Sequence, residues 1–366
     1  MTSRERLICV MTGKTPDRTP VAPFVHESTA RAWLRDSAAD AIEGTLAYCR
    51  HFGFDVILRN FNIRPDEIGP STANWIVTRE SETHGDLTTE TVRVRTPGGT
   101  LTQKTDITHL TPYLTVSARR EHFIKAPEDF ALLRRYQPEP EPADLSALRR
   151  AKALTGEAGI LAPWYFGVYS YMAQLRPLQE LLIDPFEDPE FYEDLAAYAL
   201  ERLEAALRPV LDEGLDMVSY TGNIASSTMV GARYFERYVL PHEQRLIDFI
   251  KSRCLGMVYH NCGDGDALIP LYNRLGMTCY ESMTEPPYAD NSLLHCAEGF
   301  LQEIALMGNL DQIEFLKKAS PEAVAARAGQ VLRIMRAHPR FILGTSDFIE
   351  EGTPEENLFA LAVATS

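Results

Sequence analysis

The segment Tyr259-His260-Asn261-Cys262-Gly263-Asp264 holds two strong metal-binding side chains separated by one residue. It overlaps the end of the apolar run Leu255–His260, which has the composition of a buried strand. Because strand side chains alternate with a period of two, His260 and Cys262 point to the same side. An imidazole nitrogen and a thiolate sulfur are both common ligands of Zn²⁺. A structural role is the alternative, in which His260 closes the strand and Cys262 is a small buried residue.

Two acidic residues stand at the ends of later apolar runs. Glu281 ends the run Met277–Glu281, and Asp347 follows the run Arg340–Thr345. If these runs are parallel strands of one barrel, their carboxyl ends open on the same rim. The spacing therefore predicts a metal site built from His260, Cys262, Glu281 and Asp347.

Short apolar runs that end in polar residues or glycine recur along the whole chain. Most are rich in β-branched or continuous apolar residues, as expected of strands buried on both faces. Helix starts lie between them, with a capping residue followed by proline, as in Asp188-Pro189-Glu190 and Ser320-Pro321-Glu322. The predicted strands are Thr19–Phe24, Asp55–Arg59, Gly159–Tyr165, Leu215–Tyr220, Leu255–His260, Met277–Glu281, Glu303–Gly308 and Arg340–Thr345.

This alternation predicts an α/β protein whose residues 1–366 form a single domain, a (β/α)8 TIM barrel. An open doubly wound sheet is the alternative, but no Gly-x-Gly-x-x-Gly turn follows an early strand. An antiparallel hairpin is predicted as an insertion after the second strand, over about residues 74–108. The residue types alternate along Thr89–Arg95, as in a half-buried strand. The turn sequence Thr96-Pro97-Gly98-Gly99 follows, and Thr100–Thr105 would be the second strand of the hairpin. Further on, Gln137–Pro142, with three prolines, predicts a short exposed connector.

Other residues near the predicted strand ends are candidates for contact with a substrate. The aromatic stretch Trp164–Tyr171 offers Tyr165 and Tyr169 as a wall for a flat ligand, unless these rings pack the following helix. Asn223 could orient a substrate oxygen, or it could close a turn beside Gly222.

Three basic residues lie near the same predicted rim. His26 is a candidate proton donor, with a hydrogen-bonded neutral histidine as the equal alternative. Arg59 and Arg64 could meet a carboxylate, although exposed arginine is the more common situation for each.

Composition excludes several classes of function. The chain has 366 residues, with 51 acidic and 36 basic side chains and a net charge of −15. Such a balance argues against a nucleic-acid or anionic-membrane partner, which needs a basic surface. No apolar run is long enough for a membrane span, and the first residues do not form a secretion signal. The six cysteines are too few for a disulfide scaffold, so we expect reduced thiols and a cytoplasmic location.

In the order of these motifs, the chain resembles the uroporphyrinogen decarboxylase superfamily. The resemblance rests on Arg4-Glu5-Arg6-Leu7, Pro16–Val21, Tyr234–Pro241, His260–Asp264, Gly308-Asn309-Leu310-Asp311, Gly344–Asp347 and Gly352–Asn357. It spans nearly the whole chain and implies a (β/α)8 barrel. The porphyrinogen-decarboxylating branch carries an Arg-Gln-Ala-Gly-Arg segment after the first strand, where this chain has Phe24-Val25-His26-Glu27-Ser28. Without cationic clamps, a substrate with several carboxylates is disfavoured.

The other branch, the corrinoid-dependent methyltransferases, is similar at the metal motif. These enzymes bind zinc through a His-x-Cys strand end, often a nearby acid, and a cysteine before the last Gly-Thr-Pro. His260 and Cys262 match that pattern and Glu281 fits the acid, while Asp347 stands where the family usually has cysteine. Aspartate is a harder ligand than thiolate, which favours an oxygen-bearing substrate over a thiol.

The resemblance implies a zinc-dependent methyltransferase, or O-demethylase, that moves a methyl group from a small substrate, such as a methoxy-aromatic compound, to the cobalt of a cobalamin. No Asp-x-His-x-x-Gly segment is present, so the cobalamin is expected as a free co-substrate or on a corrinoid protein. A homodimer is compatible with this interpretation. Two alternatives stay open: a cofactor-independent decarboxylase of a smaller acid, and a non-catalytic protein that binds a corrinoid or another small ligand.

Overall fold

The computed structural model describes residues 1–64, 66–141 and 143–365 and divides them into two compact units. Pro142, the last residue of the predicted connector, lies outside the described residues. The first unit comprises Met1–Ile63, Leu145–Tyr165 and Leu211–Ser366, and the second comprises Arg64–Asp144 and Phe166–Val210.

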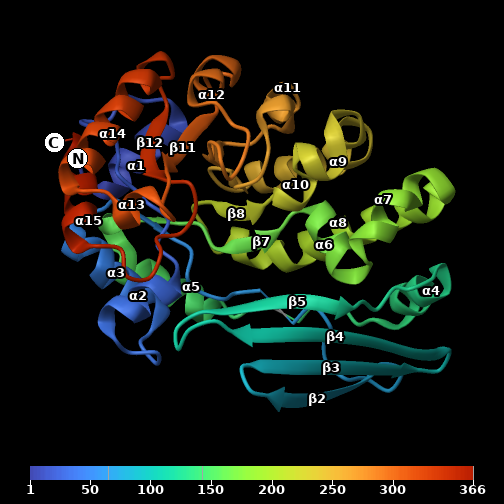
Figure 1. Cartoon of the computed structure of the whole chain (residues 1–366). Coiled ribbons are helices and arrows are strands. Elements are labelled where there is room, and N and C mark those ends of the chain that lie inside the picture. Colours follow the sequence, from blue (N-terminus) through green and yellow to red (C-terminus); the bar gives the residue numbers. More distant parts are fainter. Residues whose placement is uncertain (65, 142, 366) are drawn as a thin grey trace. The chain divides into compact units, whose positions relative to one another are not determined.

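The first unit is built on parallel strands (Figure 1). One sheet has the order β12-β11-β10-β9-β8-β7, and β1 pairs with β6 in a second, two-stranded sheet. Seven of the eight predicted strand segments contain a strand. The strands are β1 (Val56–Leu58), β6 (Gly159–Leu161), β7 (Trp164–Phe166), β8 (Val218–Thr221), β9 (Met257–Asn261), β10 (Cys279–Ser282), β11 (Ala305–Leu310) and β12 (Phe341–Thr345).

The eighth predicted segment, Thr19–Phe24, makes a single parallel bridge, from Val21 to Leu343 of β12. Backbone hydrogen bonds extend this contact: the amide of Ala22 donates to the carbonyl of Leu343 at 2.8 Å, and the amide of Asp55 donates to Val21 at 2.8 Å. The amide of Met217, just before β8, likewise donates to the carbonyl of Leu161, the last residue of β6, at 3.0 Å. These bonds link the two parallel sheets in two places: through the Val21 segment, which contacts β12 and Asp55 before β1, and through the start of β8, which contacts β6.

Helices separate most of these strands, as the sequence predicts. The α-helices of the first unit are α1 (Ser3–Thr12), α2 (Glu27–Leu34), α3 (Ala41–Phe52), α5 (Leu145–Thr155), α9 (Ser227–Tyr234), α10 (Leu240–Lys251), α11 (Ile269–Leu275), α12 (Leu293–Gly299), α13 (Phe315–Lys318), α14 (Pro321–Ile334) and α15 (Glu355–Ala362). A π-helical turn, η3 (Phe235–Val239), precedes α10, and the short 3₁₀ turns are η1 (Gly156–Ala158), η2 (Asn223–Ala225), η4 (Asp266–Leu268), η5 (Met335–Ala337) and η6 (Val363–Thr365).

Alternate residues of the strands form the core of this unit together with one face of α1. The cluster includes Val258 of β9, Cys279 of β10 and Met307 of β11, with Leu7 and Val10 of α1, all at most 1% exposed. Because strand side chains alternate, the residues two positions further along, including His260 and Glu281, lie on the same face as this core. The burial of the core residues therefore determines that His260 and Glu281 point to the same face of the sheet.

The second unit contains an antiparallel sheet in the order β2-β3-β4-β5. Its strands are β2 (Ile76–His84), β3 (Leu87–Thr96), β4 (Gly99–His109) and β5 (Thr115–Glu121), and its helices are α4 (Pro127–Tyr136), α6 (Val168–Leu175), α7 (Leu178–Glu187) and most of α8 (Pro189–Asp212). The predicted hairpin corresponds to β3 and β4, which pair from Thr96 and Gly99 outward. The predicted range 74–108 also contains β2, and β5 lies beyond it, so the sheet has four strands instead of the two of a hairpin.

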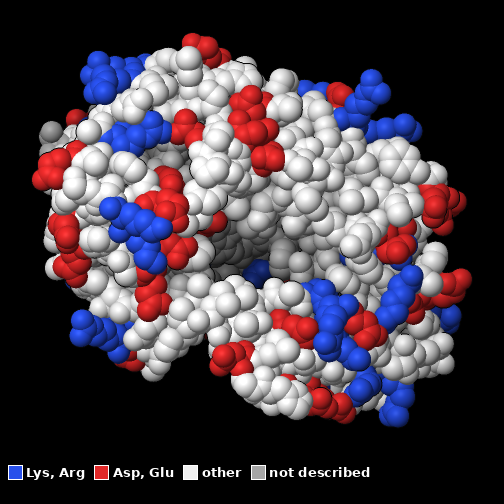
Figure 2. Space-filling model, in the orientation of Figure 1, with Lys and Arg blue, Asp and Glu red and all other residues white. Residues whose placement is uncertain are grey.

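On the face of the molecule drawn in Figure 2, acidic and basic side chains are intermixed. Among the helices that the structure describes, none has the length and apolar character required to cross a membrane. The six cysteines are all free thiols.

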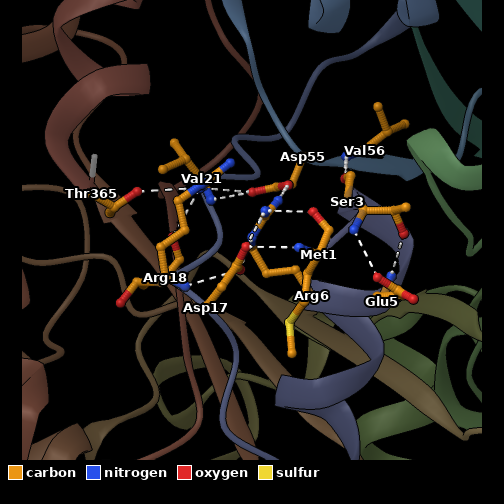
Figure 3. A network of polar contacts seen from close by, with 12 residues as sticks. Met1, Ser3, Glu5, Arg6, Asp17, Arg18, Val21, Asp55, Val56 and Thr365 are labelled. Atoms are coloured by element: carbon orange, nitrogen blue, oxygen red, sulfur yellow. Dashed lines mark hydrogen bonds and ion pairs between the residues drawn. The ribbon is translucent and has the colours of Figure 1, made fainter.

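An ionic network centred on the buried side chains of Arg6 and Asp55 joins the N-terminal helix to the first two strand segments (Figure 3). The guanidinium of Arg6 contacts Asp17 at 2.7 Å and Asp55 at 2.6 Å, and Arg18 lies 3.1 Å from the second oxygen of Asp55. That same oxygen accepts the amide of Val21 at 2.9 Å. Asp55 is 2% exposed, so its charge depends on these donors. Arg6 and the Pro16–Arg18 motif therefore have a structural role in this network.

We expect Arg6→Met to lower the free energy of unfolding by about 3 kcal/mol, because it removes one partner of a buried ion pair while Arg18 remains. Urea unfolding at neutral pH measures this loss.

The same variant changes the acid sensitivity of the fold. The hydrogen bond from Arg6 holds the pKa of Asp17 well below its usual range. Because the pKa of Asp17 is lower in the folded than in the unfolded protein, Asp17 stabilises the fold above about pH 4, and this stabilisation is lost as the pH falls further. Arg6→Met is therefore expected to lose less stability than the unmodified protein between about pH 5 and pH 3. Equal losses in both proteins over that range would contradict this role of Arg6.

Candidate functional site

Three of the four predicted ligands come together in the first unit. One ligand atom each from His260, Cys262 and Asp347 lies within 4.8 Å of the others. His260 is near the end of β9, Cys262 follows that strand, and Asp347 follows β12. His260 is 4% exposed, whereas Cys262 and Asp347 are half-buried. The Nε2 atom of His260 lies 4.0 Å from a carboxylate oxygen of Asp347.

The fourth predicted ligand, Glu281, contacts the other nitrogen of the histidine. Residues His260 and Glu281 are register partners on the adjacent strands β9 and β10, and His260 Nδ1 lies 2.9 Å from a Glu281 oxygen. Arg59 donates to both oxygens of Glu281, each at 2.6 Å. Both carboxylate oxygens are therefore engaged by Arg59 or His260, and Glu281 is absent from the group of three.

Arg59 is a correction to the sequence analysis, which favoured an exposed side chain. It is 4% exposed, and its guanidinium carbon lies 4.9 Å from the ring of Phe24 and 5.1 Å from that of Trp164. Arg64, by contrast, is exposed as expected and lies over Phe166. A buried arginine is stable only with a bonded counter-charge, and Glu281 provides one.

The electrostatics of the His260–Glu281 pair follow from burial and charge. Burial alone lowers the pKa of His260, but hydrogen bonds that the imidazole donates to Cys262 and Glu281, together with the charges of nearby carboxylates, outweigh it and raise the pKa to about 10. Burial alone raises the pKa of Glu281, but Arg59 and His260 lower it to about 2. The carboxylates of Glu281 and Asp347 thus place negative charge around His260, where a metal cation can take the place of the imidazole proton.

Aromatic rings enclose the buried side of His260. Trp164 meets the imidazole edge-on with ring centroids 5.6 Å apart, and Phe24 does so at 6.0 Å. Phe348 packs against Phe24 at 6.0 Å. These rings fix the orientation of the imidazole and keep water from that side of it.

The three grouped residues fit a divalent zinc ion. Nitrogen, sulfur and carboxylate oxygen are all common zinc ligands, and three protein ligands leave a position for an exchangeable molecule. The contact of Glu281 with Nδ1 leaves Nε2 of His260 for the ion, an arrangement that is common around metal-bound histidines.

Two further candidates border this group. His26 caps α2: its Nδ1 accepts the backbone amide of Ser28 at 3.2 Å, and its ring packs against Phe348 at 5.2 Å. Burial lowers its pKa. The side-chain amide nitrogen of Asn223 lies 4.0 Å from the sulfur of Cys262. The backbone carbonyl of Asn223 accepts a hydrogen bond from the backbone amide of Ser226, so Asn223 also forms the turn that was the alternative interpretation of this residue.

The two tyrosines predicted to touch substrate are buried. Tyr165, on β7, is 3% exposed, and Tyr169, on α6 in the second unit, is 2% exposed. Neither belongs to the lining of the cavity described next. Their contact with a substrate stays a prediction.

A cavity of about 350 Å³ opens beside Cys262 and Asp347. Its volume suits a small molecule. Of this lining, the sequence analysis predicted Cys262 and Asp347 as site residues and named Asn309 and Asp311 only within a family motif. Most of the other lining residues were missed, since loop residues carry no periodic signal. The lining residues are Cys262, Thr284, Glu285, Pro286, Tyr288, Asn309, Asp311, Gln312, Ile313, Phe315, Arg327, Ser346 and Asp347.

Comparison with known proteins links this site to one family. The family model of uroporphyrinogen decarboxylase (URO-D) matches residues 116–366, which is more than half of the chain. A methylated-thiol–coenzyme M methyltransferase of Methanosarcina mazei is 29% identical over 136 residues, covering 37% of this chain and 34% of that protein. A methylcobamide:CoM methyltransferase of the same organism is 25% identical over 128 residues, covering 35% of this chain and 36% of that protein.

A second methylcobamide:CoM methyltransferase, from Methanosarcina acetivorans, is 24% identical over 130 residues, covering 36% of this chain and 37% of that protein. The chain thus spans about a third of the length of the curated relatives it matches. Among solved structures, a methyltransferase from Methanosarcina mazei superposes with a TM-score of 0.71 at 16% identity, covering 100% of this chain and 98% of the other. This similarity gives a TIM-barrel-like α/β fold.

Proposed function

Because this chain belongs to the uroporphyrinogen decarboxylase (URO-D) family, and because its His260, Cys262 and Asp347 converge, we propose that it is a zinc-dependent methyltransferase. In this proposal it moves a methyl group from a small methyl ether, such as a methoxy-aromatic compound, to the cobalt of a cobalamin. The cobalamin is free or carried by a corrinoid protein. The curated relatives, all named as methyltransferases, support methyl transfer over decarboxylation.

His260, Cys262 and Asp347 would hold the zinc, and their grouping within 4.8 Å is the observation that carries the proposal. When bound, zinc supplies a Lewis acid that polarises an ether oxygen. Glu281, which we first predicted as a ligand, instead orients the imidazole through Nδ1. Arg59 in turn positions Glu281 by its two parallel hydrogen bonds.

His26 is proposed as the donor to the leaving oxygen. Its Nδ1 accepts the Ser28 amide, so the neutral imidazole carries its proton on Nε2 and can donate from there. Asn223, beside the sulfur of Cys262, is proposed to position the substrate oxygen. The aromatic rings of Phe24 and Trp164 pack against the imidazole of His260 and would exclude water from that side of it.

We further propose that the two parallel sheets close as one (β/α)8 barrel through the Val21 segment, and that residues 1–366 form a single domain. The backbone bonds between the two sheets support closure, and the similar methyltransferase structure supports the barrel.

Purified protein, cob(I)alamin and 2-methoxyphenol test the function directly. We expect about one zinc per chain and equal amounts of methylcobalamin and catechol, followed by absorbance and chromatography. The proposal would be refuted if the purified protein contained no zinc and formed no methylcobalamin from any aryl methyl ether. Release of CO2 from small carboxylic acids without cobalamin would support the decarboxylase alternative instead.

A further inference from the structure

Asp347 lies beyond the part of β12 that the sheet holds in place. The last register pair between β11 and β12 joins Leu310 to Thr345, two residues before Asp347. Among the described residues, the only basic side chain within 4.0 Å of its carboxylate is His260. The imidazole of His260, by contrast, is oriented by Glu281. The position of Asp347 therefore depends on the hydrogen bonds made by its own backbone segment.

That segment is tied to the end of β11 and to the turn that follows it. The backbone amide of Ser346 donates to the carbonyl of Leu310 at 2.9 Å, and the hydroxyl of Ser346 donates to the carbonyl of Asn309 at 2.9 Å. The backbone amide of Asp347 donates to Oε1 of Gln312 at 3.2 Å. Of these three bonds, the one to Gln312 is the bond that holds the backbone of Asp347 itself.

The two oxygens of the Asp347 carboxylate have different surroundings. Oδ1 accepts the backbone amide of Phe348 at 2.7 Å, whereas Oδ2 is the oxygen that lies 4.0 Å from Nε2 of His260. The bond to Oδ1 fixes the rotation of the carboxylate relative to the backbone. Oδ2 therefore points toward His260 only while the backbone of Asp347 and Phe348 keeps this conformation.

Gln312 is itself held in place. It is 4% exposed and lies in the turn between β11 and α13. In that turn the carboxylate of Asp311 accepts the backbone amides of Ile313 at 2.8 Å and of Glu314 at 3.1 Å. Because a backbone amide can only donate, the side-chain oxygen of Gln312, and not its nitrogen, must face Asp347. The glutamine thus presents a hydrogen-bond acceptor from a fixed turn.

We propose that Gln312 is a positioning residue for Asp347. Its oxygen holds the backbone amide of Asp347 and so keeps Oδ2 directed toward His260, where both side chains can bind one cation. Residues that orient metal ligands in this way contribute about tenfold to hundredfold to metal affinity. This inference rests on the proposed function, because it takes Asp347 as a zinc ligand.

The zinc affinity of the purified protein, measured by competition with a chelator, tests the proposal. Gln312→Met removes the acceptor and keeps the length of the side chain, and we expect it to weaken zinc binding about tenfold to hundredfold. Gln312→Asn keeps the amide group but is one methylene shorter, so we expect a similar loss. Gln312→Glu keeps an oxygen at the same place, and it should bind zinc at least as tightly as the unmodified protein.

A double-mutant cycle shows whether Gln312 acts through Asp347. Asp347→Ala removes the carboxylate, so adding Gln312→Met to it should change zinc affinity by less than about twofold. A merely structural role of Gln312 would instead give the same loss in both backgrounds. It would also lower the melting temperature of the zinc-free protein, which we expect to change by only a few degrees in Gln312→Met.

Gln174→Met is the matched control. The Oε1 atom of Gln174 also accepts a hydrogen bond at 3.2 Å, from Arg119. Gln174 lies on α6 in the second unit, however, and it does not line the cavity beside Asp347. This variant should bind zinc as tightly as the unmodified protein.

Three results would overturn the inference: full zinc affinity in Gln312→Met, an equal loss when that substitution is added to Asp347→Ala, or no recovery in Gln312→Glu. Failure of the proposed function is a separate outcome, because neither cobalamin nor a methyl ether enters these measurements. The expected zinc affinities in a protein that forms no methylcobalamin would reject the function and retain the role of Gln312. Methyl transfer by a protein whose zinc affinity does not depend on Gln312 would do the reverse.

Discussion

His260→Ala and Cys262→Ala are each expected to remove bound zinc and methyl transfer together. Each variant takes one of the three grouped ligands away, and two remaining protein ligands hold the ion poorly. We expect zinc to fall from about one per chain to near zero, and the rate to fall by about 10³-fold or more. Elemental analysis after dialysis measures the metal, and methylcobalamin formation measures the rate.

Cys254→Ala is the matched control for the thiol. Cys254 is also half-buried, but its sulfur bonds the backbone carbonyls of Ile250 and Gly256 instead of facing the site. It should retain both zinc and activity. A doubly substituted His260→Ala, Cys262→Ala protein that is metal-free and fully active would exclude the proposed chemistry.

Arg59→Met is expected to destabilise the protein by about 3–5 kcal/mol. The side chains of Arg59 and Glu281 are only 3% and 2% exposed, so the substitution leaves a buried carboxylate without its main counter-charge. Urea unfolding of the zinc-free protein measures the effect, so that loss of metal does not contribute to it.

The exposed pair of Arg149 and Glu213 provides the comparison. Its contact distance of 2.6 Å equals that of the buried pair, but the side chains are 63% and 27% exposed. Arg149→Met should therefore cost less than about 1 kcal/mol. Similar losses in both variants would mean that burial is not what makes Arg59 important.

Much of the parallel core could be predicted because its strands are apolar on both faces. Segments such as Leu255–His260 and Arg340–Thr345 stand out as unbroken runs, and the structure has β9 and β12 there. The antiparallel sheet was predicted only in part. β3 has buried Val92 and Val94 alternating with exposed residues, but β2 is exposed along nearly its whole length and so carries no alternation.

The candidate site divides in the same way. The His260-x-Cys262 spacing is local and visible in the sequence, whereas the pairing of Arg59 with Glu281 joins residues 222 positions apart. Only the fold brings a β1 strand end to β10, so an isolated arginine gave no reason to expect burial. The cavity lining was missed for a related reason, since Thr284, Glu285 and Arg327 lie outside the strand ends that the pattern emphasised.

The grouping of a single thiol with an imidazole and a carboxylate has a consequence for redox chemistry. A site with two neighbouring thiols can lose its ion by forming a disulfide, because oxidation joins the two sulfurs. Cys262 is the one cysteine of its group, so that route is closed within the site. Oxidation of Cys262 to a sulfenic acid remains open, and that product is reversible by thiol reductants.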